Sequence, residues 1–183
     1  VIVCGRCMAQ KLVEDGIEVE KLVMISNWPD VELIDPEMID ASGGPSQSSD
    51  LDKVRPFDKQ IKSKQRFRVL YAGNLGLGHT LDIVLNAAEV LEKQKSDIEF
   101  VFVGEGARFD YIAHERAVRC LDNIRLLPYQ PASRLREIME SGDVHLITMK
   151  DEAIGYLVPC KMYSALVVAR PCVFVGPKKS EVA

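Results

Sequence analysis

The chain has 183 residues, of which 47% are hydrophobic, and a formal net charge of -4 at pH 7. This composition is that of an ordinary globular protein, long enough for one sizeable core or for one domain and part of another. The mild acidity argues against a main role in binding nucleic acid, and no apolar run is long enough to span a membrane.

Residues 1–30 predict the end of one α/β unit. Their pattern indicates two short strands around one helix, at residues 1–3, 21–25 and 8–15. Residues 31–66 have few apolar anchors, and from residue 40 onward they are rich in Ser, Asp, Lys, Gly and Pro. That composition predicts a linker or a surface excursion between two ordered parts.

From Phe67 onward, strands and helices alternate. Near-continuous apolar runs predict five strands, at residues 68–72, 98–104, 124–127, 143–149 and 172–176. Helical spacing follows the first four of them, at residues 80–91, 107–120, 133–140 and 160–169, with Thr80 and Ser133 as candidate N-caps. Strands that are apolar on both faces belong to a parallel sheet covered by helices. We therefore predict an α/β domain with a doubly wound, Rossmann-like parallel sheet over residues 67–183, incomplete at its end.

The loop after the first of these five strands carries Gly73, Gly76 and Gly78 and leads into a helix. Glycine-permitted backbone and the N–H groups of a helix start suit this position for binding phosphate. The spacing G-x-x-G-x-G is neither the dinucleotide fingerprint nor a Walker loop. We expect a phosphate site here, and a tight turn without a ligand is the alternative.

Loops after the other strands add polar groups at the same edge of the sheet. Glu105 lies between two glycines, and Tyr129 and Gln130 supply an aromatic ring and an amide that can face a base. Lys161 lies in the first turns of a helix, where its ammonium can meet a diphosphate. The alternatives are a solvated turn residue for Glu105, a packing role for Tyr129 and a solvated helix residue for Lys161.

The histidines and cysteines do not combine at metal-ligand spacing, so we predict no metal site. His79 lies in the glycine loop and can assist phosphate binding, whereas His114 is expected on a charged helix face and His145 as a satisfied histidine in a strand. Cys4 and Cys7 form a C-x-x-C that we expect to flank a helix start, with a redox pair as the alternative. The five cysteines show no disulfide framework, which favours a reducing compartment.

A family resemblance is carried by four runs in fixed order: YAGNLG, FVGEG, IRLLPYQP and GYLVPCKMYSALVVARP. In this order they resemble the carboxyl-terminal domain of family 4 (group 1) retaining glycosyltransferases of the GT-B fold. The similarity is greatest to the bacterial branch that builds surface polysaccharide and lipid-linked oligosaccharide. The preceding MISNWPDVELIDP resembles the crossover from that family's amino-terminal domain, which would make residues 1–30 the end of that domain.

The resemblance implies a metal-independent, cytoplasmic enzyme, which the family can place at the inner face of the cell membrane. Its donor is a nucleotide-diphosphate-sugar, no other cofactor is needed, and a saccharide or lipid-linked acceptor approaches from the amino-terminal domain. This chain, as the donor-binding part, is expected to be inactive by itself. The implied donor-binding residues are Gly73, Asn74, Gly76, Gly78, His79, Glu105, Tyr129, Gln130, Lys161 and Ser164.

The sequence departs from the family pattern at its acidic signature. The two glutamates of the Glu-(seven residues)-Glu signature fall on Tyr156 and Ser164, and Ser164 offers the ribose a hydroxyl in place of a carboxylate. Asp151 and Glu152 are the nearest carboxylates and are therefore the catalytic candidates. Asn74 and His79 stand in the loop where the family has cations, and Ala169 stands where it usually has glycine.

Other function classes remain as alternatives. A nucleotide-sugar epimerase of the same fold would bind the same donor without an acceptor. A non-catalytic nucleotide-sugar-binding or interaction domain is favoured by the missing signature carboxylates. A nicotinamide oxidoreductase is disfavoured because the glycine spacing is wrong for a dinucleotide.

Overall fold

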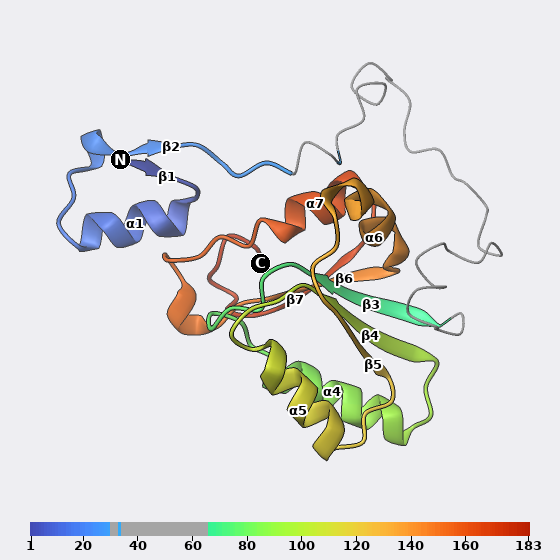
Figure 1. Ribbon diagram of the computed structural model, residues 1–183. Coiled ribbons are helices and arrows are strands. Elements are labelled where there is room, and N and C mark those ends of the chain that lie inside the picture. Colours follow the sequence, from blue (N-terminus) through green and yellow to red (C-terminus); the bar gives the residue numbers. More distant parts are fainter. Residues whose placement is uncertain (30–32, 34–65) are drawn as a thin grey trace.

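The computed structural model describes residues 1–29, 33 and 66–183 (Figure 1). The predicted linker or excursion at residues 31–66 therefore lies outside the described residues, except for Leu33 and Arg66. The described chain forms a small amino-terminal unit and a larger α/β unit, joined in sequence through that segment.

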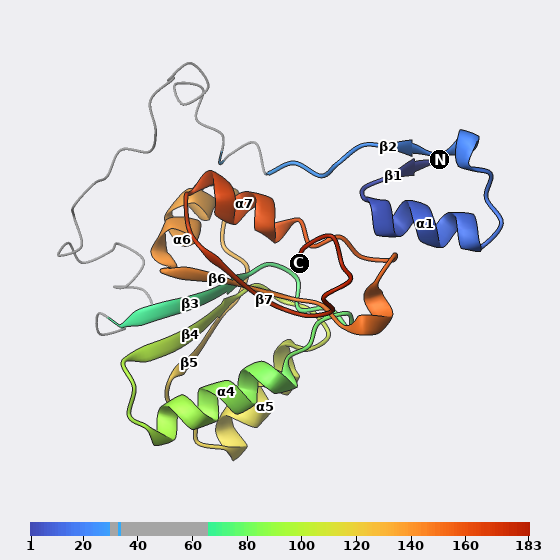
Figure 2. The same cartoon turned by 180° about the vertical axis from the view of Figure 1, so that it is seen from behind.

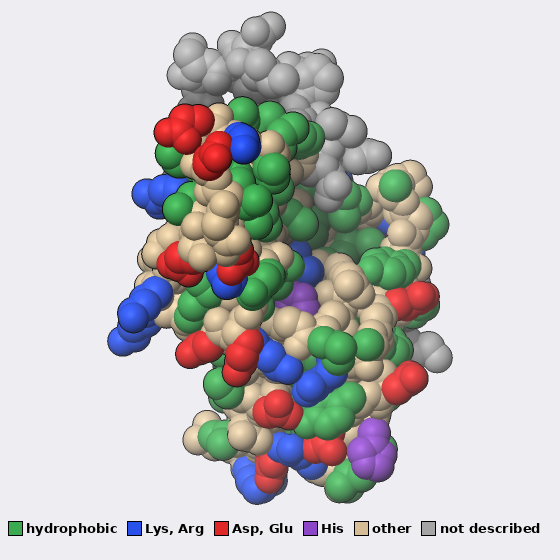
Figure 3. All heavy atoms as spheres, turned by 90° about the vertical axis from the view of Figure 1, so that its left-hand side faces the viewer, with side chains coloured by type: hydrophobic (Ala, Val, Ile, Leu, Met, Phe, Trp, Pro, Cys, Tyr) green, Lys and Arg blue, Asp and Glu red, His purple; other side chains and the backbone are tan. Residues whose placement is uncertain are grey.

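The amino-terminal unit has the predicted order of elements. The strands β1 (Ile2–Val3) and β2 (Val23–Met24) pair in parallel, and the helix α1 (Arg6–Glu14) and the short 3-10 helix η1 (Val19–Lys21) connect them. Cys4 and Cys7 flank the start of α1, as predicted, and are free thiols. Figure 3 shows hydrophobic side chains among charged ones on the face that carries this unit. More than half of the surface is exposed for Val1, Ile2, Val19, Val23 and Met24.

The larger unit contains a five-stranded parallel sheet with the strand order β5-β4-β3-β6-β7. Its strands are β3 (Phe67–Ala72), β4 (Ile98–Val103), β5 (Ile124–Leu127), β6 (Val144–Thr148) and β7 (Cys172–Val175). The chain starts in the middle, runs outward to β5, then crosses back to β6 beside β3. This is the doubly wound arrangement, and the crossing between β3 and β6 is where such sheets open a crevice at their carboxyl edge. The predicted fold class is confirmed.

Helices cover both faces of this sheet (Figures 1 and 2). The helices α4 (Asp82–Lys93) and α5 (Phe109–Val118) lie on one face, and α6 (Leu135–Ser141) and α7 (Lys161–Val167) lie on the other. Side chains alternate along β3: Tyr71 packs in the core beneath α4, whereas Leu70 packs against Ile138 of α6. His145 is buried in β6 with its Nε2 2.9 Å from the Met139 carbonyl, as expected for a satisfied histidine, and His114 is exposed on α5.

Both predicted N-caps are wrong. The cap position of α4 is Leu81, and Thr80 instead donates its hydroxyl to the Met149 carbonyl at 3.1 Å. Ser133 lies inside a 3-10 turn (η3, Ala132–Arg134) that precedes α6. The Thr80 hydroxyl bonds to the Met149 carbonyl, which follows β6 and is distant in sequence, and it makes no capping hydrogen bond to α4. The helix predicted at residues 160–169 is also shorter, since α7 ends at Val167.

A buried ion pair joins the amino ends of the adjacent strands β3 and β4. Arg68 of β3 and Glu99 of β4 lie side by side, with 2.8 Å between Nη2 and Oε1, and both side chains are 1% exposed. The guanidinium also donates to the Ser141 carbonyl. This pair lies at the edge of the sheet opposite the carboxyl ends of the strands. The Arg68–Glu99 ion pair is therefore part of the packing of the sheet and lies away from the candidate site.

Candidate functional site

A cavity of about 330 Å³ opens at the carboxyl edge of the sheet. Six of the ten predicted binding residues line it: Gly73, Asn74, Tyr129, Gln130, Lys161 and Ser164. They come from the loops after β3 and β5 and from the start of α7. The remaining wall is mainly apolar and comes largely from η3 and α6, with Leu135, Ile138 and Met139. The cavity thus combines an apolar wall with a few polar groups, as small-molecule sites do.

The glycine loop borders this cavity through Gly73 and Asn74. Gly73 donates its N–H to Val103 at 2.8 Å, and Leu75 donates to Glu105 at 2.7 Å, so the loop is fastened to the end of β4. Within the described residues, the N–H groups of Asn74, Gly76 and Gly78 donate to no protein acceptor. A fastened loop with available N–H donors is suited to bind an anion.

Gly73 must be glycine because of its backbone and its neighbour. Its φ of 131° is strained for other residues, and a Cβ placed there would lie 2.6 Å from Cε of Lys161. The Lys161 side chain therefore passes directly against the loop backbone. The structure thus brings Lys161 and the glycine loop together, and the predicted contact of this lysine with a diphosphate stays a prediction.

Lys161 presents a partly buried ammonium to the cavity. Its Nζ lies 4.9 Å from the centroid of the Tyr71 ring, within the range of a cation–π contact. Burial lowers the pKa of the Lys161 ammonium below its ordinary value. No carboxylate lies within ion-pair distance of it in the described part of the chain. A cation without an acidic partner in a cavity is a binding point for an anionic ligand.

Tyr129, Gln130 and Ser164 complete the polar lining. Tyr129 is 52% exposed, and the Gln130 side chain donates to the Pro128 carbonyl at 3.0 Å and accepts from Arg134 at 3.3 Å. Because that amide bonds within its own surroundings, the backbone of the loop is the more available partner for a ligand. Ser164 is buried one turn after Lys161, on the same side of α7.

His79 is placed beside the cavity and does not line it. Its Nδ1 lies 2.8 Å from the Thr148 carbonyl, which can only accept, so Nδ1 carries the proton. Burial is the main cause that lowers the pKa of His79 below 6.5. The ring is edge-on to Tyr71 at 5.5 Å between centroids. His79 therefore joins the glycine loop to β6 as a neutral imidazole.

The other predicted residues lie outside the cavity lining. The Gly76 and Gly78 carbonyls accept from His79 and Lys150, and Glu105 is exposed. Asp151 and Glu152, the catalytic candidates, are exposed in a short 3-10 turn, η4 (Asp151–Ala153), after β6. The structure does not bring them together with Lys161 in one cavity. Sequence reasoning missed Tyr71, although an aromatic residue just before a glycine loop was a usable signal.

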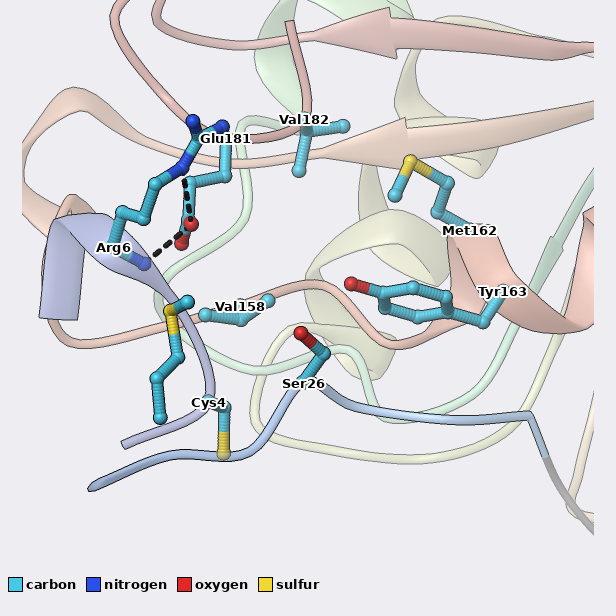
Figure 4. A pocket seen from close by; sticks show the side chains of 9 residues that line it. Cys4, Arg6, Ser26, Val158, Met162, Tyr163, Glu181 and Val182 are labelled. Carbon is cyan, nitrogen blue, oxygen red and sulfur yellow. Dashed lines mark hydrogen bonds and ion pairs between the residues drawn. The ribbon is translucent and has the colours of Figure 1, made fainter. Parts of the chain in front are cut away.

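A second cavity, of about 380 Å³, lies between the amino-terminal unit and the larger unit. Figure 4 shows Arg6 of α1 against Glu181, with the hydroxyls of Ser26 and Tyr163 directed into the space. The Glu181 carboxylate accepts from the Arg6 backbone N–H and lies 3.5 Å from its Nε. This contact holds the first turn of α1 to the end of the chain. Nothing in the local sequence around Glu181 indicated it.

The described residues contain neither a metal-ligand cluster nor a membrane-spanning helix. No group of three His, Cys, Asp or Glu side chains gathers there in a way that could hold a metal ion. None of the helices in the described ranges is both long and apolar enough to cross a membrane.

Comparison with known proteins gives a family match. The family model for "Glycosyl transferases group 1" matches residues 53–161. WcaI of Escherichia coli, named as a colanic acid biosynthesis glycosyl transferase, is 28% identical over 97% of this chain and 40% of its own length. WbjE of Pseudomonas aeruginosa, named as a glycosyltransferase, is 24% identical over 100% of this chain and 42% of its own. The chain spans about two fifths of each relative.

A solved structure shares the fold. Anabaena HepE, in complex with UDP and glucose, aligns with a TM-score of 0.64 over 96% of this chain and 44% of that one, at 14% sequence identity. A likeness at this identity concerns the fold alone.

Proposed function

Because this chain belongs to the group 1 glycosyltransferase family, we propose that it forms the donor-binding, carboxyl-terminal part of a retaining, metal-independent family 4 enzyme of the GT-B fold. In this proposal the enzyme moves a sugar from a nucleotide-diphosphate-sugar to a saccharide or lipid-linked acceptor during surface polysaccharide synthesis. The name of WcaI, which refers to colanic acid biosynthesis, supports that process, and the name of WbjE supports the transferase activity. The enzyme would act in the cytoplasm, at the inner face of the membrane where its acceptor is lipid-linked.

The observation that carries the proposal is the meeting of Lys161 with the glycine loop in one cavity. Asn74, whose N–H group is available, and Lys161 with its ammonium line the same space from different elements. A diphosphate needs both kinds of group, and the crevice beside β3 is where this sheet type binds one. In HepE, UDP and glucose are bound to a protein of the same fold.

The remaining lining suits the rest of a nucleotide-sugar. The apolar wall of α6 and the half-exposed ring of Tyr129 offer a surface for a base, whose edge can meet the backbone of that loop. Ser164 follows Lys161 by one turn and can donate or accept at a ribose hydroxyl. In this proposal the base lies beyond the diphosphate, and the sugar lies toward the loop after β6.

The chemistry assigned to the chain is stabilisation of the leaving group. Breaking the sugar–phosphate bond leaves negative charge on the diphosphate and positive charge on the anomeric carbon. Preorganised N–H groups and a cation stabilise such charge without a metal, and removing one such contact costs about 3 kcal/mol in comparable sites. Lys161 and the glycine loop are the groups present for this role. Asp151 and Glu152 stay the carboxylate candidates on the sugar side.

A thermal-shift panel with UDP, GDP, ADP and their sugars tests the proposal. A ligand at a hundred times its dissociation constant stabilises the folded chain by about 2.7 kcal/mol. We expect one class of nucleotide to stabilise the chain in this way, and we expect the corresponding nucleoside, which lacks the phosphates, to stabilise it far less. Stabilisation by none of them would contradict the proposal. If the complete protein binds the donor but transfers no sugar, the non-catalytic alternative is favoured. The non-acidic residues Tyr156 and Ser164 at the two signature positions support that alternative.

A further inference from the structure

We propose that Tyr71 is a positioning residue that holds both halves of the diphosphate grip, Lys161 through its ring and the glycine loop through its hydroxyl. This inference rests on the proposed function. Tyr71 lies near the end of β3, is 1% exposed and does not line the cavity. It acts on a ligand only through the two groups that it contacts.

The ring of Tyr71 is fixed by its neighbours. Phe102 lies 5.8 Å away between ring centroids, and His79 meets the ring edge-on. Lys161 Nζ lies 4.9 Å from the ring centroid. A fixed, buried ring attracts an ammonium through its quadrupole, and the attraction is stronger where water is excluded. His79 adds no competing charge, since burial lowers its pKa and keeps the imidazole neutral near pH 7.

The hydroxyl of Tyr71 fastens the glycine loop. It donates to the Asn74 carbonyl at 2.6 Å, and burial raises the pKa of the Tyr71 hydroxyl, so it remains a donor. The same peptide unit is held at its other end, because the Leu75 N–H donates to Glu105. With that peptide fixed on both sides, Asn74, which lines the cavity and has an available N–H group, is held in place. One side chain therefore sets the positions of the cation and of the N–H donors together.

The two contacts can be separated by substitution. Tyr71→Phe keeps the ring and removes the hydroxyl, whereas Tyr71→Leu removes both. Lys161→Met removes the ammonium and keeps an apolar side chain of similar length. Should Tyr71→Leu fail to fold, fluorinated phenylalanine at position 71 keeps the shape and withdraws charge from the ring face. Circular dichroism and thermal unfolding establish which variants are folded.

The experiment measures the affinity of UDP and of uridine for each variant by calorimetry, with GDP and guanosine if UDP does not bind. We expect Tyr71→Phe to weaken UDP by about fivefold, the effect of one lost hydrogen bond. Loss of the aromatic ring in Tyr71→Leu should weaken UDP binding by a further factor of about three to thirty. Uridine affinity should stay unchanged, and combining Tyr71→Leu with Lys161→Met should cost less than the sum of the two.

A ligand-free arm distinguishes this inference from the proposed function. The ε-CH₂ protons of Lys161 should be shifted upfield by the Tyr71 ring in the wild-type NMR spectrum, retained in Tyr71→Phe and lost in Tyr71→Leu. Absence of that shift overturns the inference. Equal losses of UDP and uridine affinity overturn it too, because they indicate a purely structural tyrosine. If no nucleoside diphosphate binds the wild type, the proposed function fails, and the NMR arm decides whether Tyr71 holds Lys161.

Discussion

Lys161→Met gives the sharpest prediction about the cavity. Methionine keeps the stem that passes against Gly73 and removes the ammonium, so the change is mainly one of charge. In the described residues no carboxylate neutralises Lys161, so its contact with a diphosphate is charge-assisted. Such a contact contributes about 1.5 to 3 kcal/mol. The affinity for UDP should therefore fall by about 10- to 150-fold.

Calorimetric titration with UDP and with uridine is the assay. Lys93→Met is the matched control, because Lys93 is exposed and pairs with Glu89 on α4, away from the cavity. Uridine should bind both variants as it binds the wild type. Since burial lowers the Lys161 pKa, wild-type UDP affinity should decline as pH rises toward 10.5, and the decline should be absent in Lys161→Met. UDP affinity within twofold of the wild type would refute the reasoning.

Three further outcomes concern the rest of the chain. Glu99→Ala should lower the free energy of unfolding by about 3 to 5 kcal/mol in urea titrations, because it removes the carboxylate that the buried Arg68 guanidinium contacts at 2.8 Å; a loss below about 1 kcal/mol would be evidence against this. Burial lowers the pKa of His79 and His145, so the unfolded chain binds more protons below about pH 6.5. The free energy of unfolding should therefore fall as the pH is lowered from about 7.5 to about 5.5, by at most about 1.4 kcal/mol per pH unit for each histidine. His145→Asn should make this dependence on pH less steep. Glu181→Ala should speed tryptic cleavage in α1, because it removes the carboxylate that holds the first turn of that helix; unchanged cleavage would show that the contact does not hold the unit.

The local sequence pattern was sufficient to predict most strands and helices of the larger unit. The strands were predictable because runs such as the one ending at Val103 are apolar on both faces, which only a covered parallel sheet requires. The helix caps were not predictable in this way. Thr80 was read from its neighbours in sequence, but its hydroxyl bonds to Met149, 69 positions away. Partners at such separations depend on the return of the chain to β6.

In the candidate site too, single residues were predictable from local sequence, whereas their contacts with one another were not. Gly73 and Lys161 were predicted separately, each from its own loop, and the crossing from β5 to β6 brings them together. Tyr71 could have been noted as an aromatic residue before the loop, but its contact with Lys161 depends on that meeting and was not predictable from the sequence. His79 appeared as a loop residue open to phosphate, whereas its ring points to Thr148. The division of the chain at residues 30 and 66 stays a prediction.

The central claim is that a nucleoside diphosphate occupies the cavity between the glycine loop and α7. Amide NMR titration with UDP, GDP and ADP in turn tests it most directly. We predict that one of them shifts the amide signals of residues 73–78, 129–130 and 161–164 together, and that Lys161→Met reduces these shifts. Shifts confined to the cavity of Figure 4, around Arg6 and Glu181, would contradict the account, as would the absence of shifts with all three.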